Sequence, residues 1–395
     1  MKNPIPLYIR NHEEAIGYNN IEPSSQMRYE DYFTENIDKE MKIVVDGFIN
    51  TLNAIQDNAT VYSKVKTLVE DSAKALWDEA IRFLQSKNNA TPDDRPLYWA
   101  RIKMLVALRG HPYFSREKNN TDLDYVVKCF EEKSRNFTGA DFSRAPSGVM
   151  KVLITGFDPF ILRSNVEQWN PSGQAALSLH GTKIGNGYIQ SMVFPVRYAD
   201  FDKGVVEKYL LPHINNIDMI ITISQGRLRY DIERFASKFR TRTIVDNLNV
   251  VKRRISYLPN AGIFSQTSEE LMPEFLETTL PVKFIIPGSL GNTRVVYNQG
   301  YKGSRTSASY SMANSGTNNI PEPSKNEIAL GGSGGTYLSN EIFYRVAVLR
   351  NHLNLDNVLK SGHLHVPKIA VNDLKLAQLG VTNIKTIIEH ATQGN

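Results

Sequence analysis

The spacing of apolar residues changes its period about one third of the way along the chain. This change constrains the fold more than any other feature. Residues 61–84 carry apolar side chains at i, i+3, i+4 and i+7, the stripe of an amphipathic helix. After residue 148 the apolar runs become short and β-branched, as in VMKVLITGF (149–157), which is typical of buried strands. The chain is therefore expected to contain two different kinds of domain.

The first third is predicted to comprise a polar, irregular arm over residues 1–35 and a small helical domain over 36–147. Besides the helix at 61–84, two further helices are expected, DDRPLYWARIKMLVALRG (93–110) and LDYVVKCFEEKSRN (123–136). In the first of these two, Asp94 is a plausible N-cap and Gly110 a plausible stop.

Cys129 is the only cysteine in the chain and falls within the apolar pattern of segment 123–136. A buried structural thiol is the expected role. A single cysteine excludes an intrachain disulfide framework and a cysteine zinc cluster.

Residues 148–395 are predicted to form an α/β domain. Further strand candidates are QSMVFPV, IDMIITIS and VKFIIPG, at 190–196, 217–224 and 282–288, and helical patterns between them lie at 171–181 and 199–215. Strands that alternate with helices favour a sheet covered by helices on both faces. Segment 297–327 is rich in Ser, Asn and Gly and is expected to be a mobile surface loop.

Charge and hydropathy exclude several classes of partner. The net charge is +5 and the pI is near 9.0. The basic clusters FRTRT (239–243) and VKRR (251–254) are short and lack an aromatic-basic stripe, so they are expected to be solvated surface and not a nucleic-acid interface. There is no signal-like apolar core in the first thirty residues and no apolar run long enough to span a membrane. The expected location is cytoplasmic.

Two phenylalanines, Phe157 and Phe160, follow the first predicted strand in VLITGFDPF. Only Gly156 is present where a phosphate-binding loop needs several glycines, so a nucleotide site is rejected. The carboxyl ends of strands are where α/β sheets place ligands. The two rings therefore either clamp a flat small group or simply pack in the core.

Ser339 is the penultimate residue of the glycine-rich stretch GGSGGTYLSN, which precedes the apolar segment EIFYRVAVLR. Ser339 or Asn340 could cap a helix there. Alternatively, Ser339 is a nucleophile that gains from the positive end of the helix dipole. His363 and His365 lie on one face of a predicted strand, and a metal site would need a third ligand that is not found nearby. With Glu233, Ser339 and His365 supply the hydroxyl, imidazole and carboxylate of a triad, provided that they meet in space.

Residues 150–395 resemble pyroglutamyl peptidase I (pyrrolidone-carboxylate peptidase, the C15 group of cysteine peptidases). The matching segments, in chain order, are KVLITGFDPF, NPSGQAA, FPVRYAD, IDMIITISQGRLRYDIERFA, TTLPVK, SGGTYLSNEIFY and GHLHVP. The first 150 residues lie outside the resemblance.

The resemblance implies a doubly wound α/β/α sandwich that needs no metal or other cofactor. It implies removal of an N-terminal pyroglutamyl group from a peptide or small amide. By position, Glu233 and His365 match the catalytic glutamate and histidine, and Ser339 falls where the family has its nucleophilic cysteine. Phe157 and Phe160 match the aromatic pair that holds the lactam ring. Three further residues in matching segments are expected to contact substrate: Asn170, Arg227 and Asn340.

The serine leaves three explanations open: a natural serine nucleophile, a Cys→Ser replacement, or an inactive site used for binding. A thiolate can exist before substrate arrives, whereas a hydroxyl must lose its proton to His365 during attack. The alternative functions are therefore a binding module for a cyclised amide group and an amide hydrolase with another substrate.

Other departures concern the surroundings of the site. Ile161-Leu162 replaces the family's Gly-Gly, the family's arginine falls at Thr243 beside Arg242, and the loop at about 289–330 is longer than usual. The helical domain could gate the site, drive homo-oligomerisation or dock a partner.

Overall fold

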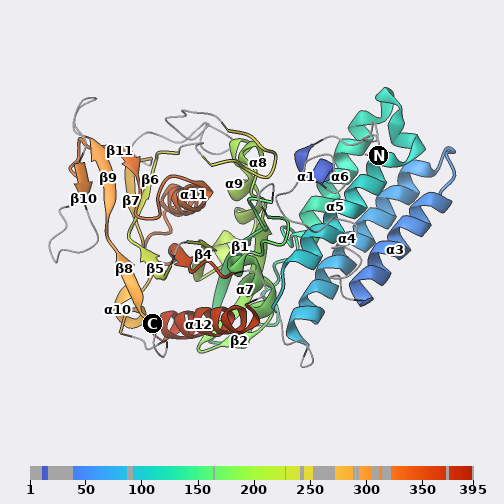
Figure 1. Cartoon of the computed structure of the whole chain (residues 1–395). Coiled ribbons are helices and arrows are strands. Elements are labelled where there is room, and N and C mark those ends of the chain that lie inside the picture. The colour runs from blue at the N-terminus through green and yellow to red at the C-terminus, as the bar shows by residue number, and fades with distance from the viewer. Residues whose placement is uncertain are drawn as a thin grey trace.

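A computed structural model describes residues 11–16, 39–86, 92–162, 165–226, 228–240, 244–251, 272–287, 290, 293–304, 311–313, 322–370 and 373–393. Within these residues, a group of helices lies beside an α/β unit (Figure 1). Three residues singled out above, Arg227, Arg242 and Thr243, lie outside the described part of the chain.

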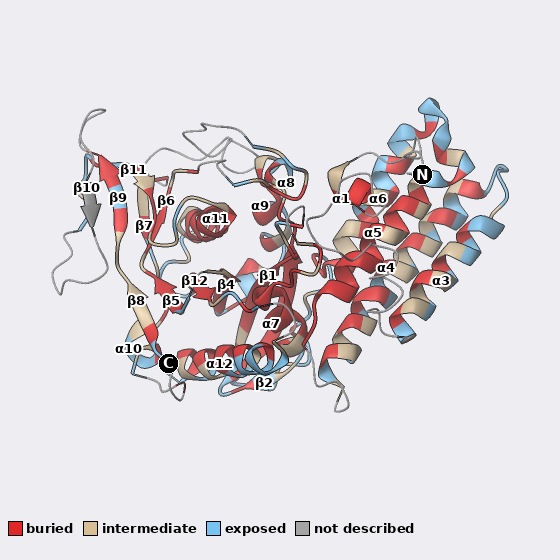
Figure 2. Ribbon diagram, viewed as in Figure 1, coloured by how far each residue is buried: buried red, intermediate tan, exposed pale blue. Residues whose placement is uncertain are grey.

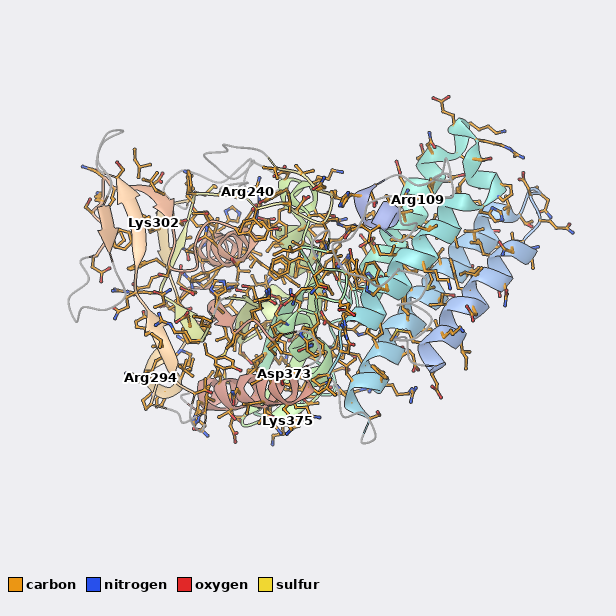
Figure 3. The ribbon with its side chains drawn as sticks, viewed as in Figure 1. Arg109, Arg240, Arg294, Lys302, Asp373 and Lys375 are labelled. Carbon is orange, nitrogen blue, oxygen red and sulfur yellow. The ribbon has the colours of Figure 1, made fainter. Side chains whose placement is uncertain are left out.

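The helical unit consists mainly of α3 (Lys39–Ala54), α4 (Val61–Gln85), α5 (Arg95–Gly110) and α6 (Asn120–Ser134). The three helices predicted at 61–84, 93–110 and 123–136 are thus confirmed. Along α4 the predicted stripe is buried, including Val61, Val65, Val69, Leu76, Ala80 and Leu84. Two short 3-10 turns, Pro112–Ser115 and Glu117–Asn119, join α5 to α6. The prediction of an irregular arm is wrong at α1 (His12–Ile16). Glu14 of α1 forms an ion pair at 2.9 Å with Arg109 of α5, which is labelled in Figure 3.

The α/β unit is built on a seven-stranded mixed sheet with the order β2-β3-β1-β4-β12-β5-β8. Its central strands β1 (Met150–Phe157), β3 (Gly187–Phe194), β4 (Met219–Gln225) and β12 (Lys360–Val366) are parallel. Strand β5 (Tyr230–Glu233) is antiparallel to β12, and β8 (Val295–Asn298) is parallel to β5. The short β2 (Lys183–Ile184) closes the other edge. Strands predicted at 149–157, 190–196 and 217–224 are confirmed.

Helices cover both faces of this sheet, which confirms the α/β/α architecture. In Figure 1, α7 (Pro171–Leu179) and α12 (Leu374–Thr392) lie on one side, and α9 (Val205–Leu210) and α11 (Leu338–His352) on the other. The helix predicted at 199–215 is divided into α8 (Tyr198–Asp202), α9 and a 3-10 turn at Ile214–Asn216. The break between α8 and α9 is Gly204, whose φ of 71° lies in the left-handed region that glycine adopts without strain.

Three local predictions are wrong. Segment 282–288 was expected to be a strand but contains α10 (Val282–Ile285), which packs beside α12. A short apolar run does not distinguish a strand from a buried helical turn. Parts of the mobile loop expected at 297–327 are strands, because β9 (Tyr301–Ser304) and β10 (Ser311–Ala313) lie within it. They form a small antiparallel sheet with β11 (Ile328–Gly331), which follows the segment. A second small sheet pairs β6 (Phe235–Ser237) with β7 (Phe275–Glu277).

The third wrong prediction concerns Arg240, in a cluster that was expected to be solvated. Its side chain, labelled in Figure 3, is fully buried. It forms ion pairs with Glu341 Oε2, at 2.6 Å, and with Asp202. A buried guanidinium requires such partners, and both come from other elements, α11 and α8. The prediction that Arg240 is exposed is therefore wrong, because its burial depends on tertiary contacts with distant elements.

The helical unit shares its hydrophobic core with the α/β unit. The buried side chains of α3–α6 form one continuous cluster with Leu162, Ala176, Leu177 and Val193. Figure 2 shows buried positions running along the helices that face the sheet. The two units are therefore packed as one body across α7 and β3.

A buried ionic cluster lies within the same contact. Asp158 directly follows β1, and its carboxylate accepts bonds from Arg101 of α5 at 2.9 Å and from Arg135, just after α6, at 2.7 Å. All three side chains are only 1% exposed. Because these charges are buried, each depends on its partners.

We expect Asp158→Asn to lower the free energy of unfolding by about 3–5 kcal/mol, because it takes the shared carboxylate from two buried guanidinium groups, of which Arg135 keeps Glu131 as a partner. Urea denaturation followed by circular dichroism would measure this. Asp78→Asn is the matched control, since Asp78 pairs with Lys74 on the exposed face of α4. It should change stability by less than about 0.5 kcal/mol. Equal effects of the two substitutions would contradict the assignment.

The contact between the two units also contains His180, which packs edge-on against Trp77 with ring centroids 5.5 Å apart. Its Nδ1 accepts a hydrogen bond from the Ser191 backbone N–H, and burial lowers its pKa from 6.5 to about 4. A lowered folded-state pKa stabilises the fold above pH 6.5, and this contribution is lost as pH falls towards 4.

We therefore expect the stability difference between the unmodified chain and His180→Gln to shrink by about 3 kcal/mol between pH 7 and pH 4. Urea unfolding of both chains across this range is the measurement. A difference that stays constant with pH would show that His180 does not titrate in this way.

Candidate functional site

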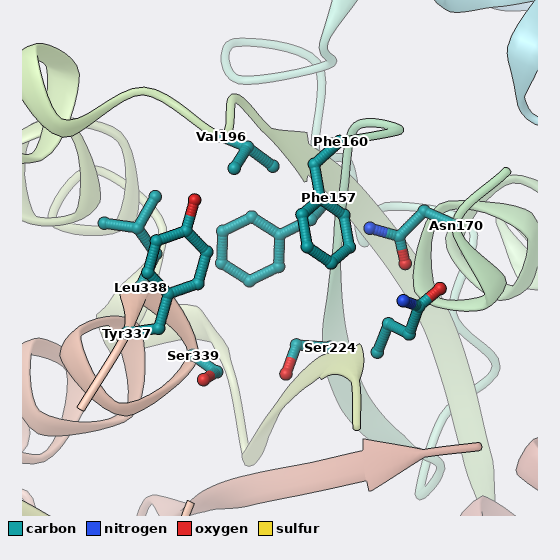
Figure 4. A pocket seen from close by; sticks show the side chains of 9 residues that line it. Phe157, Phe160, Asn170, Val196, Ser224, Tyr337, Leu338 and Ser339 are labelled. Atoms are coloured by element: carbon teal, nitrogen blue, oxygen red, sulfur yellow. The ribbon is translucent and has the colours of Figure 1, made fainter. Parts of the chain in front are cut away.

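A pocket opens at the carboxyl ends of β1 and β4, the edge at which parallel sheets place ligands. It contains about 290 Å³ of empty space, part of it open to solvent. Figure 4 draws the side chains that line it: Phe157, Phe160, Asn170, Val196, Ser224, Gln225, Tyr337, Leu338 and Ser339. Four of the predicted site residues, Phe157, Phe160, Asn170 and Ser339, are thus brought together.

The aromatic side chains form one wall of the pocket. Phe157 is largely buried and packs against Phe201 with centroids 6.2 Å apart, while Phe160 is half-buried and lies 6.4 Å from Tyr337. Phe157 therefore belongs both to the core and to the pocket. Packing in the core and lining the pocket are thus compatible roles for Phe157.

The loop after β1 is held in place from several sides. Asn170 Nδ2 donates to the Asp158 carbonyl at 2.9 Å, and Asn247 Nδ2 donates to the Pro159 carbonyl at 2.9 Å. The Asp94 carboxylate accepts the backbone N–H of Asn170 at 3.1 Å. Phe160 is consequently presented to the pocket from a fixed backbone.

Asp94 occupies the N-cap position of α5, as predicted, but its side chain does not cap that helix. It is committed to Asn170 across the contact between the two units. Burial, followed by the charge of Asp93, raises its pKa well above 3.8.

Ile161 and Leu162 do not line the pocket, so the predicted change to its wall is not seen at these positions. Leu162 is buried in the core shared with the helical unit. Ile161 has a φ of 63°, which is strained for a β-branched residue. The helices pack against Leu162, which explains why this position carries a side chain where the resemblance expects glycine.

Ser339 is the second residue of α11, and Tyr337 occupies the N-cap position. Neither Ser339 nor Asn340 is therefore the helix cap. The Ser339 hydroxyl donates to the Gly334 carbonyl at 3.5 Å, a long contact that leaves it weakly held. It lies at the positive end of a 15-residue helix and faces the pocket.

Asn340 points away from the pocket. Its amide donates to the carbonyls of Ser237 and Phe239, at 2.9 and 3.1 Å, and accepts the Ser237 N–H at 2.9 Å. It therefore fixes the start of α11 against β6. Asn340 is not among the residues that line the pocket, so the structure does not support the substrate contact predicted for it.

Glu233 and His365 form a buried pair. Glu233 Oε1 lies 2.6 Å from His365 Nδ1, and Asn298 Nδ2 donates to Glu233 Oε2 at 2.8 Å. Burial raises the pKa of Glu233 above 4.5, while the bond to His365 opposes that shift. With Glu233 ionised, the proton of a neutral imidazole lies on Nδ1, and Nε2 is left free to act as a base.

Gly334 separates this pair from Ser339. A Cβ at position 334 would lie 2.9 Å from His365 Cε1, so only glycine fits against the imidazole. The Gly334 carbonyl is also the acceptor of the Ser339 hydroxyl. Ser339 and His365 form no hydrogen bond with each other in this structure.

Sequence reasoning missed several residues of the site. Ser224 ends the strand predicted at 217–224 and Gln225 follows it at the ligand edge, so their position alone could have identified them. Asn298, which holds Glu233, lay in the segment expected to be a loop, and Val196 and Tyr337 reach the pocket only through tertiary folding.

Metal binding and membrane insertion receive no support within the described ranges. They contain no cluster of three His, Cys, Asp or Glu side chains suited to a metal ion. None of their helices is both long and apolar enough to cross a bilayer.

The α/β unit is similar in sequence to pyrrolidone-carboxylate peptidases. The pyrrolidone-carboxylate peptidase of Pyrococcus furiosus is 30% identical over 156 residues, which cover 38% of this chain and 67% of that protein. The enzyme of the same name from Staphylococcus haemolyticus is 30% identical over 169 residues, covering 38% and 71%. The solved structure of Bacillus amyloliquefaciens pyroglutamyl peptidase I aligns with 62% of this chain and 97% of its own, at 20% identity and a TM-score of 0.43.

A longer similarity extends across both units. Residues 28–123 match the family described as PA0049 N-terminal domain, and residues 151–274 and 294–370 match PA0049, C-terminal domain. The Pseudomonas aeruginosa protein of that designation, itself called uncharacterized, is 27% identical over 393 residues, covering 78% of this chain and 70% of its own. The chain therefore belongs to the PA0049 family, with a pyrrolidone-carboxylate peptidase-like region in its α/β unit.

Proposed function

We propose that the chain is a hydrolase that removes an N-terminal pyroglutamyl group from a peptide or small amide. The observation that carries this proposal is the buried Glu233–His365 pair, with its 2.6 Å contact. Gly334 contacts the imidazole of this pair, and its carbonyl accepts the Ser339 hydroxyl of a pocket that also holds aromatic rings. The similarity to pyrrolidone-carboxylate peptidases supports the choice of substrate.

The pocket suits a small, flat, uncharged ring. Its walls are mainly apolar and aromatic, with a few polar groups, as expected for a small-molecule site. Phe157 and Phe160 are the side chains that would pack against the lactam. The amide bond to be cleaved would then lie towards Ser339.

In the first chemical step, Ser339 Oγ attacks the carbonyl carbon of the pyroglutamyl group. His365 Nε2 takes the hydroxyl proton as the O–C bond forms and then gives it to the leaving amine as the C–N bond breaks. Glu233 stabilises the imidazolium and keeps the proton on Nδ1. In the second step a water molecule, deprotonated by His365, hydrolyses the ester and restores Ser339.

The negative charge that develops on the carbonyl oxygen needs nearby donors. The first N–H groups of α11, at Leu338 and Ser339, have no acceptor one turn earlier in the helix. They lie at the positive end of the helix, beside the attacking hydroxyl. These backbone groups are the proposed oxyanion donors.

The present orientation of Ser339 favours a second candidate function. Its hydroxyl is directed at the Gly334 carbonyl and not at His365, so turnover requires the hydroxyl to turn towards His365. If no rotation occurs, the same pocket would bind a cyclised amide group without cleaving it. Hydrolysis assays with a panel of amides that differ in their acyl group would distinguish an amide hydrolase with another substrate from both functions.

The first test is release of a reporter amine from a pyroglutamyl amide. We expect the unmodified chain to be active and Ser339→Ala to lower kcat on the order of 10⁴-fold or more. Ser143→Ala, in an exposed turn, is the control and should be without effect. If only Ser339→Cys is active, the site requires a thiol. If lactam binds equally well to all variants and none turns over, the chain is a binding module.

The second test concerns Glu233. Glu233→Gln is expected to lower kcat on the order of 10³- to 10⁴-fold with little change in KM, because the amide neither charges nor orients the imidazole correctly. Glu277→Gln is the control, since Glu277 pairs with Arg234 at the surface. A kcat within threefold of the unmodified chain would remove Glu233 from the mechanism.

A further inference from the structure

The proposed reaction leaves one imidazole near the pocket without a role. His363 lies on β12 two residues before His365, is fully buried, and places its ring edge-on to His365 with centroids 4.6 Å apart. Its two ring nitrogens lie 2.8 Å from Thr222 Oγ1 and 2.8 Å from Ser224 Oγ. Both hydroxyls come from β4, because the parallel register sets His363 beside Thr222 and His365 beside Ser224.

The protons of this group have one fully satisfied arrangement. Thr222 Oγ1 also lies 3.0 Å from the Gly362 carbonyl, which can only accept. Thr222 has a single proton, so both of its contacts form only if it donates to Gly362 and accepts from His363 Nδ1–H. A neutral His363 then has an unprotonated Nε2, which accepts the proton of Ser224. The other tautomer gives one hydrogen bond fewer.

His363 is held in its neutral form. Burial, and then the neighbouring His365, lower the pKa of His363 well below 6.5. Its ring nitrogens contact the hydroxyls of Thr222 and Ser224, which do not favour the cation as a carboxylate would. At neutral pH the direction of the Ser224 proton is therefore fixed by the tautomer.

Ser224 also lines the pocket, where Figure 4 shows it on the same side as Ser339 and opposite Val196. With its proton given to His363, its oxygen offers only lone pairs to a ligand. The next residue, Gln225, lines the pocket as well, and its Oε1 is buried with no partner among the described residues. The end of β4 thus carries two oxygen acceptors that lack a donor.

We propose that Ser224 determines specificity by accepting a hydrogen bond from a ring N–H of the substrate, and that His363 is the positioning residue that holds the Ser224 proton. This inference rests on the proposed function in one respect, namely that the ring is a lactam. Ligands with N–H at this place gain a bond, whereas ligands with CH₂ leave a buried acceptor unsatisfied.

The substrate test compares two reporter amides, pyroglutamyl and 3-oxocyclopentanecarbonyl, in which CH₂ replaces the ring N–H. We expect the unmodified chain to prefer the lactam by about 100-fold in kcat/KM, because a site built around an N–H rejects the analogue that lacks it. Ser224→Ala should reduce this preference to about tenfold or less. It should do so mainly by slowing hydrolysis of the lactam.

Three further variants separate specificity from general damage. Ser224→Thr retains the oxygen and should retain most of the preference, and Ser143→Ala should leave it unchanged. His363→Phe keeps an aromatic ring beside Phe343 but frees the Ser224 proton, so the preference should fall while hydrolysis of the CH₂ analogue persists. A purely structural role for His363 would instead slow both substrates equally.

A second measurement requires no substrate. ¹⁵N NMR of the full chain labelled at histidine, with the His363 signals identified by their loss in His363→Phe, reports which ring nitrogen carries the proton. We expect a proton on Nδ1 and none on Nε2. A protonated Nε2 would overturn the inference, whatever reaction the chain performs.

The outcomes separate this inference from the proposed function. Hydrolysis of both amides without preference would overturn the role of Ser224 and leave the hydrolase intact. If pyroglutamyl amide binds calorimetrically without being cleaved, and Ser224→Ala abolishes its preference over the CH₂ analogue, the inference stands and the hydrolase fails. If the lactam is neither bound nor cleaved, both are overturned.

Discussion

The carboxylate of Asp158 joins the two units of the molecule, and the geometry of the pocket depends on it. Arg101 and Arg135 of the helical unit converge on this one side chain, and all three side chains are buried. Asp158 lies between Phe157 and Phe160, so the ion pairs that fix it also fix the two aromatic side chains of the pocket. The helical unit is thereby a structural part of the site, whatever other partners it has.

The chemical role of each histidine of β12 follows from the side chains that it contacts on the neighbouring strand. His365 faces Glu233, and a carboxylate on Nδ1 makes its far nitrogen a base. His363 faces two hydroxyls of β4, and burial keeps it neutral. The same residue type, two positions apart, is thus suited to proton transfer in one case and to orienting a hydroxyl in the other.

Much of the fold could be predicted because it follows from periodicity. The stripe along 61–84 predicted α4, and the β-branched runs predicted β1, β3 and β4. Segment 282–288 failed because a short apolar run fits a buried helical turn as well as a strand. The prediction for the segment around β9 and β10 failed because its polar composition conceals short strands, which pair in a small sheet separate from the main one.

The sequence by itself determined the chemistry that is available: a carboxylate, a hydroxyl, two histidines on one strand face and two phenylalanines after a strand. Those features depend on residue type and local spacing, which a chain carries before it folds. Tertiary structure alone decided how they are used. It placed Glu233 against His365, 132 positions away, and His363 against Ser224. It also directed Asn340 away from the pocket and buried Arg240. Each of these contacts requires strands or helices that are distant along the chain.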